Sequence, residues 1–210
     1  MILPRLYPIL DTAALAARGM EPETAARVMI ESGARILQFR HKEHFSRAVF
    51  ARVERVAALC AESGTQFIVD DRADIAALAG AGVHVGQDDL APADARRIVG
   101  PHAIVGFSTH NAGQLRAAAG EPADYLAIGP VFGTRSKEKP DPIVGLEALP
   151  GLRKLAGKPL VAIGGITRAT AAAVLEAGAD SVAVIADLLP DPLTAAALRE
   201  RMEEWLTLLK

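Results

Sequence analysis

Eight short apolar runs, separated by longer amphipathic stretches, constrain the fold of this chain more than any other feature. The runs span residues 6–10, 36–39, 67–69, 83–85, 104–107, 125–128, 160–163 and 182–185. Most of them lack polar alternation, which is typical of parallel strands buried on both faces. The stretches between them carry apolar residues at spacings of three and four, which predicts helices that cover a sheet from outside. The pattern therefore predicts repeated strand–helix units joined by right-handed crossovers.

The count of eight favours closure into a (β/α)8 TIM barrel over an open, doubly wound sheet. The 210 residues suit one domain spanning residues 1–210. Segment 129–145, after the sixth run, contains three prolines and is expected to be a mobile active-site loop. Near the C-terminus, Asp191 and Pro192 offer a cap and a first position for the last helix.

Composition limits the classes of partner. The formal net charge is -2, which gives no indication of a nucleic-acid or membrane partner. The one cysteine, Cys60, excludes an intrachain disulfide and a multi-cysteine metal site. No apolar stretch reaches the roughly 18–20 residues that span a bilayer, and the first residues lack a signal-peptide core, so a cytoplasmic protein is expected.

Polar side chains follow the ends of six of the predicted strands. Because the carboxyl ends of barrel strands share one face, these sets are expected to surround one pocket. In chain order they are residues 38–42, 70–72, 84–89, 108–110, 134–137 and 164–165.

Gln38, Arg40 and Lys42 alternate along an extended segment, so all three are expected on one side. Two cations and an amide suit a phosphate or a diphosphate. The alternative is a charged strand end that faces solvent. Lys137, in the long loop, adds a third cation and favours the anion site.

Asp71 and Asp89 follow neighbouring strands. Two carboxylates near a bound phosphate are what Mg2+ uses, since it shares hard oxygen ligands with substrate phosphates. The alternative is that Asp71 pairs with Arg72 or caps a helix, and that Asp89 caps the helix beginning near Pro92.

Gly164 and Gly165 follow the seventh strand, the usual place for a phosphate site in this fold. Backbone N–H groups at Ile185 and Ala186 are further candidate donors. Ser108 and His110 are two residues apart, but a Ser–His hydrolase lacks an obvious third member. His84 is expected to be a hydrogen-bonded residue of the barrel interior.

Taken in order, these segments resemble the thiamine phosphate synthase family and its close relative, the TenI thiazole tautomerases. The resemblance runs from residue 6 to the last helix. The segments that carry it are QFRHK at 38–42, DRAD at 71–74, GVHVGQDDL at 82–90, GFSTH at 106–110, GPVFGTRSK at 129–137 and AIGGI at 162–166.

The resemblance implies an enzyme that joins hydroxymethylpyrimidine diphosphate to a thiazole phosphate, giving thiamine phosphate and pyrophosphate. It implies a dissociative substitution, in which Mg2+ and cations stabilise the leaving pyrophosphate. The implied roles are Gln38 on the pyrimidine; Arg40, Lys42 and Lys137 on the diphosphate; Asp71 and Asp89 on Mg2+; Ser108 on the pyrimidine or leaving group; and Thr134, Ser136, Gly164, Gly165, Ile185 and Ala186 on the thiazole phosphate.

Three positions depart from the family pattern. Asp70 stands where Asn is usual, and a carboxylate there would repel a diphosphate unless it is turned away, protonated, paired with a cation or bound to metal. Ser136 replaces a threonine and keeps the hydroxyl. Ala186 replaces a serine and loses one phosphate donor, though not its backbone N–H.

Three functions remain open at this point. The first is the synthase, which the retained cations and acids favour. The second is a TenI-type tautomerase with His110 as an acid–base group, for which Asp70 is the best argument. The third is a phosphate-ligand binding protein without turnover. The expected partners are small phosphorylated molecules, and a homodimer is one possible assembly.

Overall fold

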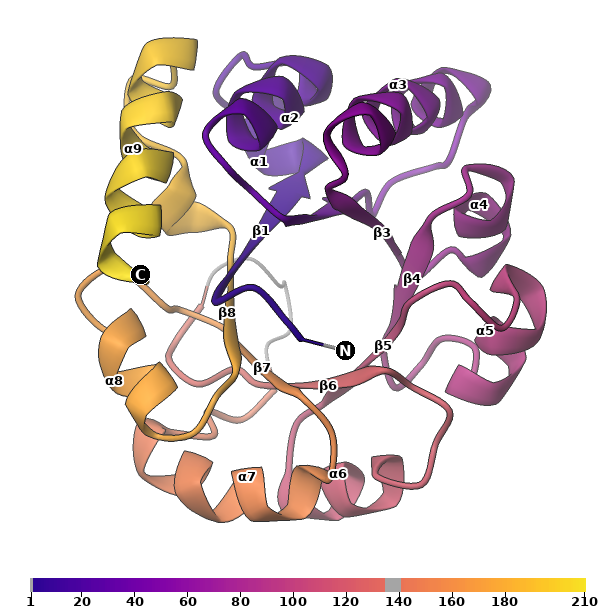
Figure 1. Cartoon of the computed structure of the whole chain (residues 1–210), viewed down its shortest axis with the longest axis vertical. Coiled ribbons are helices and arrows are strands. Elements are labelled where there is room, and N and C mark those ends of the chain that lie inside the picture. Colours follow the sequence, from indigo (N-terminus) through magenta and orange to yellow (C-terminus); the bar gives the residue numbers. More distant parts are fainter. Residues whose placement is uncertain (1, 135–140) are drawn as a thin grey trace.

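The chain closes into a barrel of eight parallel strands, as predicted (Figure 1). The computed structural model describes residues 2–134 and 141–210. Each strand pairs with the next along the sequence, and β8 pairs with β1. The strands are β1 (Leu6–Asp11), β2 (Ile36–Arg40), β3 (Gln66–Asp70), β4 (Gly82–Val85), β5 (Val105–Thr109), β6 (Tyr125–Ile128), β7 (Leu160–Ile163) and β8 (Ser181–Val184).

Helices form a ring around the outside of the barrel (Figure 1). Each apolar stripe packs inward: in α3, for example, Val53, Val56 and Cys60 are buried. The α-helices are α1 (Thr12–Ala16), α2 (Pro22–Glu31), α3 (Arg47–Ser63), α4 (Ala73–Leu78), α5 (Pro92–Val99), α6 (Ala112–Ala118), α7 (Leu149–Ala156), α8 (Ala171–Glu176) and α9 (Ala195–Leu208). Two short 3-10 helices, η1 (Leu146–Ala148) and η2 (Ala186–Leu188), precede α7 and follow β8.

Two layers of buried side chains hold the barrel. Strand residues that face outward pack with the helices in one large cluster. Residues that face inward fill the barrel itself, among them Tyr7, Ile36, Ile68 and Tyr125. The bulky branched and aromatic residues inside make this a packed core rather than a channel.

One expected helix start is wrong. The last helix begins at Ala195, not at Pro192, because the Thr194 side chain accepts a hydrogen bond from the Ala197 N–H and so caps the helix there. A cap followed by proline matched the start signal, but the chain continues irregularly for two more residues before it becomes helical.

The described ends of segment 129–145 are attached to the barrel. The N–H groups of Val131 and Phe132 donate to the carbonyls of Ile163 and Gly164 at the end of β7. Within the segment, the Val144 N–H donates to the Pro130 carbonyl and so joins its second end to its first. The centre of the segment lies outside the described residues, so its mobility stays a prediction, as does the division into a single domain. Among the described residues, no helix combines the length and apolar character needed to cross a membrane.

Candidate active site

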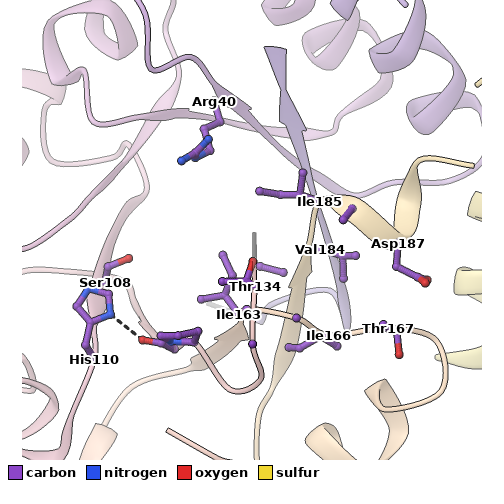
Figure 2. Close-up of a pocket in the computed structure, with 17 residues that line it drawn as sticks. Arg40, Ser108, His110, Thr134, Ile163, Ile166, Thr167, Val184, Ile185 and Asp187 are labelled. Carbon is purple, nitrogen blue, oxygen red and sulfur yellow. Dashed lines mark hydrogen bonds between the residues drawn. The ribbon is translucent and has the colours of Figure 1, made fainter. Parts of the chain in front are cut away.

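Two adjoining cavities open at the carboxyl ends of the strands. One has a volume of about 410 Å³ and lies against β6, β7 and β8; the other, of about 520 Å³, extends over β2, β3 and β4. Six residues line both: Arg40, Ser108, His110, Ile163, Ala183 and Ile185. We call the first the phosphate-side cavity, because residues predicted to bind a phosphate line it, and the second the charged cavity. Figure 2 shows the phosphate-side cavity, with Ser108 and His110 at one side and Ile185 and Asp187 at the other.

The charged cavity receives Gln38, Arg40 and Lys42 together, as their alternation predicted. Gln38 and Arg40 are the third and last residues of β2, and Lys42 lies two residues further on. Their side chains therefore project to the same side of an extended segment. Gln38 and Arg40 are largely buried at this strand end, whereas the Lys42 side chain is 44% exposed.

Arg40 and Lys42 are held in a chain of ion pairs. Arg40 contacts Asp11 directly, and its Nε lies 3.6 Å from an Asp70 carboxylate oxygen. The Lys42 ammonium lies 2.8 Å from Asp70 and 2.5 Å from Asp71. Acids and bases alternate along this chain, so Asp70 sits between two cations. Of the four states considered for Asp70, pairing with a cation is the one observed.

The pKa values of this chain reflect its burial. Burial raises the pKa of Asp70 to about 6, with a further contribution from the charge of Asp71, although Lys42 and Arg40 act in the opposite direction. Burial lowers the pKa of Lys42, but its attraction to Asp70 and Asp71 outweighs burial and raises that pKa overall. Lys42 is therefore a firmly charged cation in the cavity.

Asp71 and Asp89 both line the charged cavity. Asp71 has a φ of 63°, a left-handed conformation that is rare for residues other than glycine. Asp89 accepts a hydrogen bond from the Gly86 N–H at 2.7 Å, and burial followed by the charge of Asp71 raises its pKa. The alternative roles are wrong, because Arg72 pairs with Asp74 and no side chain caps α4 or α5.

Ser108 and His110 enter the site from β5 and the residue after it. The Ser108 hydroxyl lies 2.8 Å from Nε2 of His84, which confirms His84 as a hydrogen-bonded residue of the barrel interior. Nδ1 of His110 lies 2.6 Å from the Gly129 carbonyl, the bond drawn as a dashed line in Figure 2. Since a carbonyl only accepts, Nδ1 carries the hydrogen and Nε2 of a neutral His110 is an acceptor.

The phosphate-side cavity is bounded by glycine backbone. Gly164 and Gly165 have φ values of 99° and 64°. A Cβ on Gly164 would lie 2.5 Å from Cα of Pro130, and one on Gly165 would lie 2.8 Å from Cβ of Phe132. Side chains are excluded at both positions, so the chain after β7 can approach the loop after β6 closely.

The remaining predicted residues divide into two groups. Thr134, Ile185 and Ala186 line the phosphate-side cavity. Ser136 and Lys137 lie outside the described residues, so their places in the site stay predictions.

Several lining residues were not anticipated as part of the site. They include Tyr7 and Tyr125 in the barrel, and Thr167 and Asp187 at its rim. Asp11 lines neither cavity but contacts Arg40, and it was not anticipated either. Asp11 had a usable signal, because it follows the first apolar run just as the predicted sets follow theirs. The two tyrosines had none, since each falls inside an apolar run.

The family model described as thiamine monophosphate synthase matches residues 6–188. The chain belongs to this family. A thiamine-phosphate synthase of Koribacter versatilis is 48% identical over 99% of this chain and 96% of its own length. One of Methanoculleus marisnigri is 41% identical over 94% of each chain. The solved thiamine phosphate pyrophosphorylase of Pyrococcus furiosus has a TM-score of 0.83 and 32% identity, covering 98% of this chain and 95% of the other.

Membership of the thiamine monophosphate synthase family agrees with the resemblance and with the barrel. The carboxylate at position 70 departs from the usual family pattern in charge, and it pairs with Lys42 and Arg40, which also pair with Asp71 and Asp11.

Proposed function

We propose that this chain is a thiamine phosphate synthase. It would join hydroxymethylpyrimidine diphosphate to hydroxyethylthiazole phosphate, giving thiamine phosphate and pyrophosphate. The observation that carries the proposal is the pair of adjoining cavities that share Arg40 and Ser108. One is rich in charge and suits a diphosphate, and the other is apolar with a glycine-lined end that suits an aromatic phosphate monoester.

The charged cavity supplies what a departing diphosphate requires. Arg40 and Lys42 present cations, and such groups stabilise charge on a leaving group in a site from which water is partly excluded. Lys137 is proposed as a third cation. Gln38 would orient the pyrimidine, and Ser108 would contact the pyrimidine or the leaving group.

Asp71 and Asp89 fit a magnesium ion. Both carboxylates face one cavity, and the left-handed backbone of Asp71 aims its side chain there. In residues 2–134 and 141–210, no cluster of three or more metal-ligating side chains is found. Two carboxylates are nevertheless enough, since Mg2+ takes its other ligands from waters and substrate phosphates. When bound, the ion would neutralise charge developing on the diphosphate.

The phosphate-side cavity would hold the thiazole phosphate. Gly164 and Gly165 line this cavity together with Ile185 and Ala186, and their backbone N–H groups are proposed as donors to the anion. Thr134 and Ser136 are proposed as hydroxyl donors. A thiazole held there would face the pyrimidine across Ser108, the arrangement that a substitution needs. This chemistry requires no protein nucleophile.

Release of pyrophosphate tests the proposal. Purified protein is given both substrates with and without Mg2+, and we expect metal-dependent pyrophosphate release together with thiamine phosphate. Isomerisation of a thiazole carboxylate phosphate without such release would indicate the tautomerase, for which the acceptor Nε2 of His110 is the supporting observation. Tight binding of thiazole phosphate without either reaction would indicate a binding protein. Cytoplasmic location and a homodimer stay predictions.

A further inference from the structure

A chain of buried hydrogen bonds crosses the barrel interior from Gln38 to Ser108. Nε2 of Gln38 lies 3.3 Å from the Tyr7 hydroxyl, and that hydroxyl lies 2.9 Å from the hydroxyl of Tyr125. The Tyr125 hydroxyl lies 2.9 Å from Nδ1 of His84. Nε2 of His84 then reaches Ser108 at 2.8 Å.

The residues of this hydrogen-bond chain are buried and packed inside the barrel. Tyr7 and Tyr125 are fully buried, and Gln38 and His84 nearly so. The His84 ring stacks on Tyr125 with centroids 5.5 Å apart and planes inclined by 23°. Gly106 provides the room for this stack, because a Cβ there would overlap both rings. A buried polar network of this kind is stable only when its members are satisfied.

The available donors and acceptors fix the direction in which the hydrogen bonds are donated from Gln38 to Ser108. The Gln38 amide nitrogen can only donate, so the Tyr7 oxygen accepts from it. Burial raises the pKa values of Tyr7 and Tyr125, so both keep their hydrogens. If Tyr125 donated to Tyr7, the Tyr7 hydrogen would have no acceptor among the described residues, at the cost of an unsatisfied buried group.

Each hydrogen bond is therefore donated in the direction of the cavity. Tyr7 donates to Tyr125, and Tyr125 donates to Nδ1 of His84. A neutral His84 then carries its hydrogen on Nε2 and donates it to Ser108. The Ser108 oxygen accepts, and among residues 2–134 and 141–210 its own hydrogen meets no acceptor, so it is available to a ligand.

We propose that Tyr125 and His84 are positioning residues that make the Ser108 hydroxyl a hydrogen-bond donor toward the substrate. This role deepens the proposed synthase function, in which Ser108 contacts substrate. Phosphate oxygens are acceptors only, so a hydroxyl committed to donation suits a diphosphate or a pyrimidine ring nitrogen. A hydroxyl free to turn would lose part of that preference.

The His84 tautomer tests the chain without any substrate. Protein with 15N-labelled histidine is studied by NMR at mildly alkaline pH, and the His84 signals are assigned from a His84→Asn variant. We expect hydrogen on Nε2 and a bare Nδ1. Hydrogen on Nδ1 would overturn the proposal. Tyr125→Phe, which keeps the stacked ring, removes the hydrogen bond to Nδ1 and should move the Nδ1 signal toward that of an unbonded acceptor nitrogen, while Tyr7→Phe should leave it unchanged.

A double-mutant cycle tests whether Tyr125 acts through Ser108. Tyr125→Phe should lower kcat/KM about tenfold, the worth of one hydrogen bond near 1.4 kcal/mol. In a Ser108→Ala background the same change should have an effect below about twofold. A tenfold loss in both backgrounds would refute action through Ser108. If the wild type releases no pyrophosphate, the proposed function fails. The His84 tautomer still tests the direction of the hydrogen bonds from Gln38 to Ser108 independently.

Discussion

Asp11 and Arg40 lie opposite each other in the β1–β2 register, and their side chains form an ion pair at the mouth of the barrel. Asp11 is buried, with one carboxylate oxygen on Arg40 and the other 2.8 Å from the Ala14 N–H, where it caps α1. One side chain therefore fixes both the first helix and the guanidinium that lines both cavities. Arg40 is placed by its neighbouring strand before any substrate binds.

Asp11→Asn separates these two roles. Asparagine caps a helix about as well as aspartate but carries no charge to hold Arg40. We expect kcat/KM for the pyrimidine diphosphate to fall by about tenfold to a hundredfold, because a misplaced catalytic group costs that much. Asp11→Ala should lose the same activity and also about 1 kcal/mol more stability, from the lost cap. Steady-state kinetics and urea denaturation measure the two effects, and full activity of either variant would contradict the role given to Asp11.

Asp70→Asn tests whether the acid at position 70 competes with substrate. Its carboxylate pairs with Lys42 and Arg40, the cations proposed to bind the diphosphate, and two unit charges at 4 Å repel by about 4 kcal/mol at an effective dielectric of 20. We expect the variant to bind inorganic pyrophosphate with Mg2+ roughly tenfold more tightly, a conservative share of that repulsion. Calorimetric titration measures this. Weaker binding would show instead that Asp70 positions the two cations.

The same residue gives a pH dependence of stability in the metal-free protein. Burial raises the pKa of Asp70 to about 6 in the folded chain, from an ordinary value of 3.8. Between these values the folded state binds more protons than the unfolded state, so stability falls as pH rises. Compared with Asp70→Asn, wild type should lose up to about 3 kcal/mol between pH 4 and pH 6. Denaturation of both proteins in chelator, at several pH values, measures the difference; parallel curves would show that the pKa is not raised.

The sequence predicted the strands because their signal is local. Both ends of each apolar run lie within about two residues of the ends of an observed strand. Gln38, Arg40 and Lys42 line one cavity, as their alternation along the chain predicted. Contacts that depend on register and burial carried no such signal. Nothing near Asp11 in the sequence indicates that it faces Arg40 across a strand pair. Likewise Tyr7 and Tyr125, 118 residues apart, meet only because the barrel closes. The apolar pattern of the sequence locates the strand ends, but the contacts between side chains depend on how the sheet closes.

Gly165→Ala tests the close approach that forms the phosphate-side cavity. A Cβ at this position would overlap the Gly133 carbonyl, and the φ of 64° is itself costly for alanine. The loop after β6 would have to move away, so we expect a stability loss of about 1–3 kcal/mol and at least a tenfold loss of thiazole phosphate affinity. Gly151→Ala is the matched control, because it lies in α7 with no atom within 4 Å of its Cβ. That variant should keep its affinity and gain about 0.5–1 kcal/mol from helix propensity. Equal affinities in the two variants would mean that the glycine turn after β7 does not hold the phosphate.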